Sequence, residues 1–395
     1  MLAHTTPLDA RFLAALREVV GFSNGITTLH EPEFRGNEWS LVKDCLDSTF
    51  VSYVGKYVEQ FEHMLADYTG AKHCIVVVNG TVALQVAMKM AGVGPRDEVI
   101  VPALSFVATA NAVAHAGAVP HFVDVNAITL GLDPEALGEH LSAIAEITSE
   151  GVRNRNTGRR IAAIVPMHTY GHPVDLDPLL ELAGRFHLPI VEDAAESLGS
   201  FYKGRHTGTF GVLGTLSFNG NKIVTTGGGG AILTDDSELA RRTKHLTTTA
   251  KRPHRWEFFH DEVAWNFRLP NINAAVGCAQ MERLNDLLAR KRALAERYKA
   301  VFSHLEGMRF MAEPPDTRSN YWLNTVALET PAMASRDALL ATANDAGYQC
   351  RPTWTLLHKL PIYADAPWSA VPVAENLEAS IINVPSSPKL VESRS

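Results

Sequence analysis

The sequence is poor in cysteine and contains no long apolar run. Its four cysteines lie far apart and form no Cys-x-x-Cys pair: Cys45, Cys74, Cys278 and Cys350. This spacing argues against a zinc site or a disulfide framework, so we predict no metal and expect a reducing, cytoplasmic setting. The N-terminus has no basic stretch followed by an apolar core, and no segment approaches the length of a membrane span. We therefore predict neither a signal peptide nor a membrane-spanning helix.

Neither sign of charge dominates the sequence. Thirty-six Lys and Arg residues face 43 Asp and Glu residues, for a net charge of −7. Basic residues cluster at 153–160 and 251–255, but Gly, Thr, Pro or Asn surround them, and we interpret both clusters first as solvated loops. Nothing here resembles the basic surface of a nucleic-acid-binding protein, so we predict no nucleic-acid partner.

The common glycine-rich nucleotide motifs are also missing. The glycine run 227–230 matches neither G-x-x-x-x-G-K-[ST] nor G-x-G-x-x-G in a strand–helix context. The sequence shows no internal repeat and no low-complexity tract. Its apolar content of 46% is enough for a sizeable core, and 395 residues suit two domains.

Short apolar segments alternate with helical patterns over the middle of the chain. We expect strands at residues 73–78, 98–102, 119–124, 160–167, 188–193, 214–218 and 229–234, with helices at 80–91, 107–115 and 177–186. Continuous apolar strands are buried on both faces, and strand–helix alternation is typical of parallel sheets. The pattern predicts an α/β fold with a mostly parallel, seven-stranded sheet flanked by helices.

The pattern changes after about residue 265. A long amphipathic helix is expected at 273–302, then sparse strands at 321–328, 348–352 and 381–385 and a helix at 335–346. We predict an N-terminal segment over 1–40, a large α/β domain over 41–265 and a smaller C-terminal α+β domain over 266–395. Residues 247–263 are polar, aromatic and basic without a period, which predicts a long functional loop.

Polar residues follow several of the expected strands, at the edge where open α/β sheets bind ligands. Gly80 and Thr81 stand at a helix start, whose free N–H groups and partial positive charge suit a phosphate. A simple helix cap with a turn glycine is an equal alternative. Asp193 ends a buried strand, where an acid is costly unless it is paired; a capping or metal-binding acid is its alternative interpretation.

Lys222 lies in a polar turn just before the glycine run. Glycine-rich backbone lets a bulky ligand approach closely, and a lysine beside a cofactor phosphate and ring can form a Schiff base. A solvated surface lysine is the ordinary alternative. Pyridoxal phosphate (PLP) needs such a lysine, an acid at its pyridine nitrogen, donors for its phosphate and preferably an aromatic face. Phe106 could supply that face or could be a core residue.

In linked order, these residues resemble the DegT/StrS-type sugar-nucleotide aminotransferases, a family of fold-type I PLP enzymes. The resemblance runs from about Pro32 to Pro385 and is carried by the motifs GNEWSLVKDCLDS, GKYVEQFEHMLADYTG, NGTVALQVA, DEVIVPALSFVATANAV, HTYGHPVDLDPL, VEDAAESLGS, SFNGNKIVTTGGGGAI and WNFRLPNINAAVGCAQMERL. It implies a PLP-dependent aminotransferase with this fold.

The resemblance also implies a role for each matching residue. Lys222 is the expected Schiff-base lysine and general acid and base, and Asp193 the partner of the pyridine nitrogen. Asn266 resembles an asparagine that reaches a neighbouring subunit's phosphate, which implies a homodimer with shared active sites. Gly80, Thr81 and Ser217 are expected to contact the cofactor's phosphate. Phe106 is expected to stack on its ring, and Glu196 to contact its ring hydroxyl.

The chain departs from the common family pattern at two places. Gly227–Gly230 replaces Gly-Glu-Gly-Gly, and Asn219-Gly220 replaces His-Pro. The form SFNGNK…TTGGGG is similar to a LegC-like branch that aminates UDP-4-keto-6-deoxy-N-acetylglucosamine in amino-sugar biosynthesis for cell-surface polysaccharides. That substrate, with L-glutamate as donor, is therefore expected. Related dehydrases carry a histidine in place of the lysine, so Lys222 argues against their chemistry.

The sugar site is the least determined part of the sequence. Motif position makes His168, Tyr170, Tyr321, Arg351 and His358 candidates, and for each histidine a structural role is an equal alternative. Residues 251–255 are expected either to meet the nucleotide diphosphate or to be solvated. Two other classes remain as alternatives: a PLP-binding regulator without catalysis, which would need a DNA-binding region, and a nucleotide-sugar oxidoreductase or epimerase, which would need a dinucleotide fingerprint.

Overall fold

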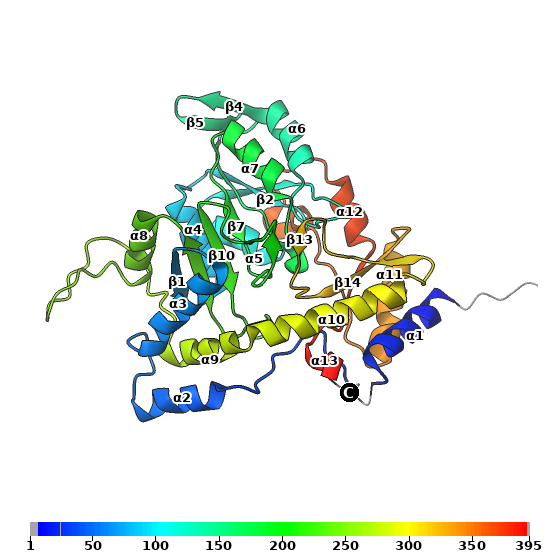
Figure 1. The fold of residues 1–395 in the computed structure, drawn as a ribbon. Helices are drawn as coiled ribbons and strands as arrows, with labels where there is room; N and C mark the ends of the chain where they lie inside the picture. Colours follow the sequence, from blue (N-terminus) through cyan, green and yellow to red (C-terminus); the bar gives the residue numbers. More distant parts are fainter. Residues whose placement is uncertain (1–6, 24, 393–395) are drawn as a thin grey trace, which may run out of the picture.

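The computed structural model describes residues 7–23 and 25–392 and is built around one large twisted sheet (Figure 1). Its strands are β1 (His73–Val77), β2 (Glu98–Pro102), β3 (Val119–Val123), β6 (Arg160–Ile164), β7 (Val191–Asp193), β10 (Leu213–Ser217) and β11 (Gly230–Thr234). Their order is β1-β11-β10-β7-β6-β2-β3, with β7 joined to β6 through bridges from Ile164 to Ile190 and from Met167 to Asp193. Only β11 runs antiparallel to its neighbours, which confirms the mostly parallel seven-stranded prediction.

Helices cover this sheet and leave its strands buried. The helices of this part are α2 (Glu38–Asp47), α3 (Lys56–Thr69), α4 (Gly80–Met90), α5 (Val107–His115), α6 (Pro134–Ile144), α7 (Leu176–Arg185), α8 (Ser237–Thr247) and α9 (Asn271–Glu282). Helix α4 packs against β7, β10 and β11, and α3 packs against β1 and α9. Every residue of β2 and of β11 is buried, as expected for strands covered on both faces.

A second, antiparallel sheet forms the C-terminal part of the fold. Its order is β12-β14-β16-β15, with strands β12 (Met308–Phe310), β14 (Asn324–Leu328), β15 (Arg351–Pro352) and β16 (Ile381–Val384). Around it lie α10 (Leu284–Phe302), α11 (Met333–Asp345), α12 (Pro372–Glu378) and α13 (Lys389–Glu392). The N-terminal helix α1 (Leu8–Val20) buries Phe12, Leu16 and Val19 in the same apolar cluster, against α10 and α11. Helix α1 thus packs with the C-terminal part of the fold, and the three domain limits stay a prediction.

Three elements differ from the sequence-based expectations. The long helix expected at 273–302 is two helices that meet at Arg283, because α9 packs on α2 and α3 whereas α10 packs on α1. Strands β4 (Ala145–Thr148) and β5 (Gly151–Asn154) form an additional hairpin at the edge of β6. A small sheet of β8 (Phe201–Tyr202), β9 (Arg205–His206) and β13 (Thr317–Arg318) also went unpredicted.

Residues 248–263 form the long loop that the sequence predicts. Isolated bridges from Thr248 to Asn266 and from Lys251 to His260 hold its two sides together, and it projects from the body next to α8 (Figure 1). Among the described residues, no helix has both the length and the apolarity needed to cross a membrane.

Candidate active site

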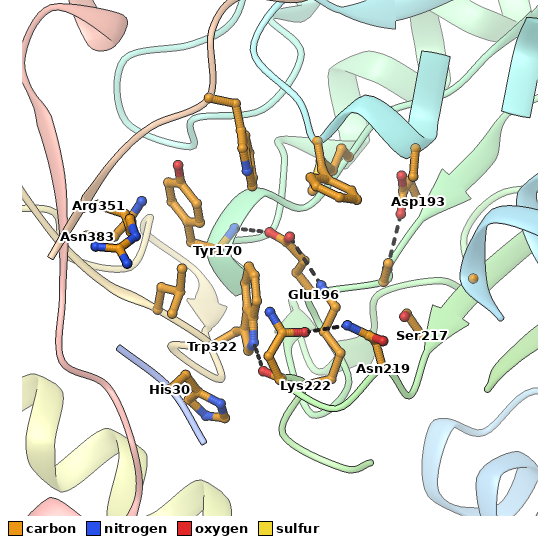
Figure 2. Close-up of a pocket in the computed structure, with 18 of the residues that line it drawn as sticks. His30, Tyr170, Asp193, Glu196, Ser217, Asn219, Lys222, Trp322, Arg351 and Asn383 are labelled. Atoms are coloured by element: carbon orange, nitrogen blue, oxygen red, sulfur yellow. Dashed lines mark hydrogen bonds and ion pairs between the residues drawn. The ribbon is translucent and has the colours of Figure 1, made fainter. Parts of the chain in front are cut away.

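A cavity of about 670 Å³ opens at the carboxyl ends of β1, β7 and β10 (Figure 2). Residues of the C-terminal sheet and of the segment before α2 close its other side. All of the predicted cofactor-binding residues except Asn266 line it: Gly80, Thr81, Phe106, Asp193, Glu196, Ser217 and Lys222. The tertiary structure therefore brings together residues from four separate strand ends.

The first turn of α4 forms one end of the cavity. Asn79 caps the helix, since its side-chain oxygen accepts a hydrogen bond from the Val82 N–H at 2.9 Å. Gly80 follows, and a Cβ atom at that position would come within 2.9 Å of the Ser217 Cβ. The glycine therefore leaves the helix N-terminus and Ser217 close together, where free backbone N–H groups and a hydroxyl can hold a phosphate. A helix cap and a phosphate site are compatible at this turn, because Asn79 caps the helix and Gly80 faces the cavity.

The carboxylates of Asp193 and its neighbour Glu192 have different hydrogen-bond partners. The Asp193 carboxylate lines the cavity and accepts hydrogen bonds from the Thr109 hydroxyl at 2.7 Å and the Ala195 N–H at 3.2 Å. Burial raises its pKa, and a cationic ligand group beside it would favour its ionised form. Glu192 instead accepts hydrogen bonds from the backbone N–H groups of residues 208, 210 and 211 and contacts the ring of His168. It therefore holds the 208–211 loop in place.

Lys222 extends into the cavity beside Glu196 and Trp322 (Figure 2). Its Nζ atom lies 3.3 Å from Glu196 Oε1 and 3.8 Å from the centroid of the Trp322 ring. The other Glu196 oxygen accepts the Tyr170 N–H at 2.9 Å. Burial raises the pKa of Glu196 to about 7, against the opposing charge of Lys222. Lys222 is therefore not a solvated surface lysine, since its side chain is only 12% exposed and contacts the buried carboxyl group of Glu196.

Aromatic rings form the wall opposite α4. Phe106 is not a core residue, because 47% of it is exposed and its ring faces the cavity 6.0 Å from that of Trp354. The Tyr170 ring lies 5.0 Å from Trp354 and 6.4 Å from Trp322. Tyr170 adopts a left-handed backbone conformation with φ of 56°, which is uncommon for a bulky residue and holds its N–H toward Glu196.

Three predicted substrate residues do not line the cavity. His168 is fully buried between Glu192 and the Val174 N–H, which corresponds to the structural alternative. The Tyr321 hydroxyl accepts the Glu313 N–H at 3.0 Å, and the His358 ring stacks on Trp368. Tyr170 and Arg351, which came from the same motifs, do line the cavity.

Asn266 also lies outside the cavity, near the base of the 248–263 loop. Its side-chain oxygen accepts a hydrogen bond from Arg268 at 2.7 Å. The guanidinium of Arg268 in turn stacks over the Tyr53 ring at 3.4 Å. The next residue, Phe267, accepts the Val78 N–H at 3.0 Å, so Asn266 lies near the chain that leads into α4 but does not line the cavity of its own subunit.

Several lining residues were missed by the sequence-based reasoning. His30, Trp322, Trp354 and Asn383 all reach the cavity. Trp322 and Trp354 each stand close to a residue that was considered, Tyr321 and Arg351, so the neighbouring aromatic side chains were an available signal. No local pattern marks His30 or Asn383, whose positions depend on chain segments that meet only in the folded protein.

Comparison with known proteins agrees with this arrangement. Residues 32–394 match the DegT/DnrJ/EryC1/StrS aminotransferase family. GDP-perosamine synthase of Caulobacter vibrioides is 37% identical over 362 residues, which are 91% of this chain and 93% of that protein. EpsN of Bacillus subtilis, classed among the pyridoxal phosphate-dependent aminotransferases, is 35% identical over 86% of this chain and 84% of its own length.

A solved structure shows the same fold over nearly the whole chain. The aminotransferase TlmJ from Streptoalloteichus hindustanus superimposes with a TM-score of 0.83 at 30% identity, covering 93% of this chain and 96% of that one. Aminotransferases of this family use PLP as cofactor. This chain is a PLP-dependent enzyme that belongs to the DegT/DnrJ/EryC1/StrS aminotransferase family.

Proposed function

We propose that this enzyme transfers an amino group from L-glutamate to the keto carbon of a nucleotide-linked sugar. The observation that carries the proposal is the single cavity in which Lys222, Asp193 and the α4 N-terminus converge. When bound, PLP supplies an aldehyde that takes up the amino group and a ring that accepts negative charge. The residues fit its three ends, since a lysine, a buried acid and a phosphate cradle lie around one space.

The chain's own residues divide the remaining tasks. Gly80, Thr81 and Ser217 bind the phosphate and so set the position of the ring. Asp193 keeps a positive charge at the pyridine nitrogen. Lys222 Nζ would hold the cofactor and, as general acid and base, would move the proton at the carbon that exchanges its amino group. Glu196 holds that amine in reach, as the 3.3 Å contact supports.

The substrate enters between the aromatic wall and the C-terminal sheet. Arg351 and Asn383 line that side of the cavity (Figure 2), and we assign Arg351 to the anionic groups of the substrates. Tyr170 and Trp354 offer flat surfaces to a sugar ring.

The nucleotide has two candidates. A GDP-linked keto-sugar is favoured by the GDP-perosamine synthases of Caulobacter vibrioides, Escherichia coli and Vibrio cholerae, which are 33–37% identical to this chain. UDP-4-keto-6-deoxy-N-acetylglucosamine is favoured by the SFNGNK…TTGGGG motif. The two candidate nucleotide sugars differ in the base of the nucleotide and in the substituent at C2 of the sugar, so a direct assay of each shows which one the enzyme uses.

We further propose that the enzyme is a homodimer. Large apolar side chains are exposed on α2, on the following loop and on the 248–263 loop: Trp39, Phe50, Val51, Tyr53, Val54, Trp256, Phe258, Phe259 and Val263. Exposed apolar groups gathered on neighbouring segments are typical of interfaces. Asn266 lies at the base of this surface. If a second subunit packs there, the Asn266 side chain of one subunit would lie near the cavity of the other.

The test is a panel assay with purified enzyme, PLP and L-glutamate against UDP-, GDP- and dTDP-linked keto-sugars. We expect formation of 2-oxoglutarate and of an amino sugar with at least one of them, and no turnover by Lys222→Ala or Lys222→Arg. Mass spectrometry after borohydride reduction should place the cofactor on the peptide that contains Lys222. Near-normal turnover by a Lys222 variant, or an adduct elsewhere, would contradict the proposal.

A further inference from the structure

His30 occupies a place in the cavity wall that the proposed reaction has not yet used. It lies in the segment between α1 and α2, beside Trp322 and Lys222 (Figure 2). Both of its ring nitrogens are buried and neither makes a well-formed hydrogen bond with the described residues, although the Asn221 backbone lies close enough to affect the ring. The nearby Asn221 carbonyl already accepts the Trp322 indole N–H at 2.7 Å.

The surroundings of His30 keep its ring neutral. Burial lowers its pKa well below the usual value, and the positive charges of Lys291 and Lys222 lower it further, while the Asn221 carbonyl opposes this shift. Lys291 is itself buried and donates to the Trp322 and Ser386 carbonyls. A neutral imidazole presents one N–H donor and one acceptor nitrogen.

A buried polar group without a partner is destabilising, and this cost is recovered if a ligand supplies the missing hydrogen bond. The two ring nitrogens point in different directions, so one hydroxyl group satisfies one of them, either by donating to the acceptor nitrogen or by accepting from the N–H. A carboxylate or a phosphate instead prefers cations or several donors. Because His30 lies next to Lys222, the group that it meets must be close to the reacting carbon.

We propose that His30 binds a hydroxyl group of the sugar substrate next to the carbonyl that is aminated. This inference rests on the proposed function and adds a specificity-determining residue to it. L-Glutamate has no hydroxyl, so His30 acts on the sugar half of the reaction and leaves the donor half unchanged. The same cavity can then discriminate between its two substrates through a single neutral side chain.

The test compares His30→Leu and His30→Gln with the wild type and with His172→Leu. His172 is a matched control, because both of its ring nitrogens are also buried and unpartnered but it does not line the cavity. Calorimetry measures the Kd of cofactor-free protein for the nucleotide-linked amino sugar that the wild type forms, GDP-perosamine or its UDP-linked counterpart. Stopped-flow absorbance measures the loss of the cofactor's visible band after L-glutamate is added.

We expect His30→Leu to weaken sugar binding about tenfold, the usual effect of one lost hydrogen bond, with an unchanged glutamate step. His30→Gln should recover part of the affinity, and His172→Leu should match the wild type in both measurements. An unchanged Kd in His30→Leu, or an equal loss in the glutamate step, would overturn the inference.

A change in the ligand tests the same contact in the wild-type protein, so the result does not depend on whether a variant folds. A nucleotide sugar that lacks the hydroxyl beside the amino carbon should bind the wild type about tenfold more weakly. The same deletion should cost nothing further in His30→Leu, where the contact is already lost; an equal additional loss in that variant would contradict the inference. If the wild type aminates no nucleotide-linked keto-sugar, the proposed function fails first and the inference falls with it.

Discussion

Asp193 and Glu192 are adjacent in the chain, yet the strand places their carboxylates on opposite sides of it. Asp193 faces the cavity with two hydrogen-bond donors, whereas Glu192 is surrounded by backbone N–H groups and His168. Asp193→Asn should lower kcat about 100- to 1,000-fold, because the amide cannot stabilise a positive charge. Its affinity for PLP, from an absorbance titration, should change much less. Glu192→Gln should instead lower the free energy of unfolding by about 2–4 kcal/mol, since its amide would face N–H donors.

The reverse pattern, with a stability loss in Asp193→Asn and a chemical defect in Glu192→Gln, would show that the two acids have been assigned the wrong way round. Urea unfolding and single-turnover kinetics on the same preparations separate the two effects.

Glu196 predicts a pH dependence of stability in the cofactor-free protein. Burial raises its folded-state pKa from 4.5 to about 7, so between these values the unfolded chain has lost a proton that the folded chain keeps. Stability from this group is therefore present below pH 4.5 and is lost as the pH rises through 7, by about 3 kcal/mol at ~1.4 kcal/mol per pKa unit.

Glu196→Gln removes this titration. Its unfolding free energy relative to the wild type should increase by about 3 kcal/mol from pH 4.5 to pH 8, since each pKa unit is worth ~1.4 kcal/mol. Urea unfolding at several pH values measures the difference. Parallel curves for the two proteins would mean that Glu196 titrates near its ordinary pKa.

Helix α4 is the element that we propose to bind the phosphate at the sheet edge. Its first turn approaches Ser217 so closely that a Cβ at Gly80 would lie 2.9 Å from the Ser217 Cβ and 3.2 Å from its Oγ. Gly80→Ala should therefore displace Ser217 and raise the Kd for PLP about tenfold, the effect of misplacing one hydrogen bond. Absorbance titration of the cofactor-free protein measures this Kd.

Gly184→Ala is the matched control for that substitution. Gly184 lies in α7, and a Cβ there would meet nothing within 4 Å. We expect an unchanged Kd for PLP and a gain in stability of about 0.5–1 kcal/mol from the helix preference of alanine. A comparable loss of PLP affinity in both variants would show that the approach of α4 to Ser217 is unimportant.

In the proposed homodimer, the assembly of two chains would decide whether each cavity is complete. If Asn266 serves the partner's cavity, a mixed dimer of Lys222→Ala and Asn266→Ala subunits contains one site with both defects and one with none. Random reassociation of these two impaired proteins should then restore about a quarter of wild-type activity, because half of the dimers are mixed and half of their sites are intact.

Lys222→Ala mixed with Asp193→Ala is the control, since both residues line the same subunit's cavity and no intact site can form. Activity is measured after mild denaturation and joint refolding, with light scattering to give the oligomeric state. Equal recovery in both mixtures, or none in either, would count against shared sites.

Much of the fold and half of the site follow from local sequence. The apolar strands and the residues at their ends determine that Gly80, Asp193, Ser217 and Lys222 reach one edge, because parallel strands end on the same side of a sheet. The break at Arg283 was not predictable from the helical pattern, since the apolar period continues through it and only the packing of α9 and α10 on different helices separates them.

The sequence by itself therefore determined the fold class, through short-range periodicity, and the family, through the resemblance of its linked motifs, and it placed most of the proposed cofactor-binding residues within a few positions of a strand end. Only the tertiary structure decided the substrate side. It buried His168 and Tyr321 in the core and brought His30, Trp322, Trp354 and Asn383 to the cavity. Those side chains come from segments far apart in the chain, and only the packing of the C-terminal sheet and the N-terminal segment against the large sheet selects which of them face the ligand.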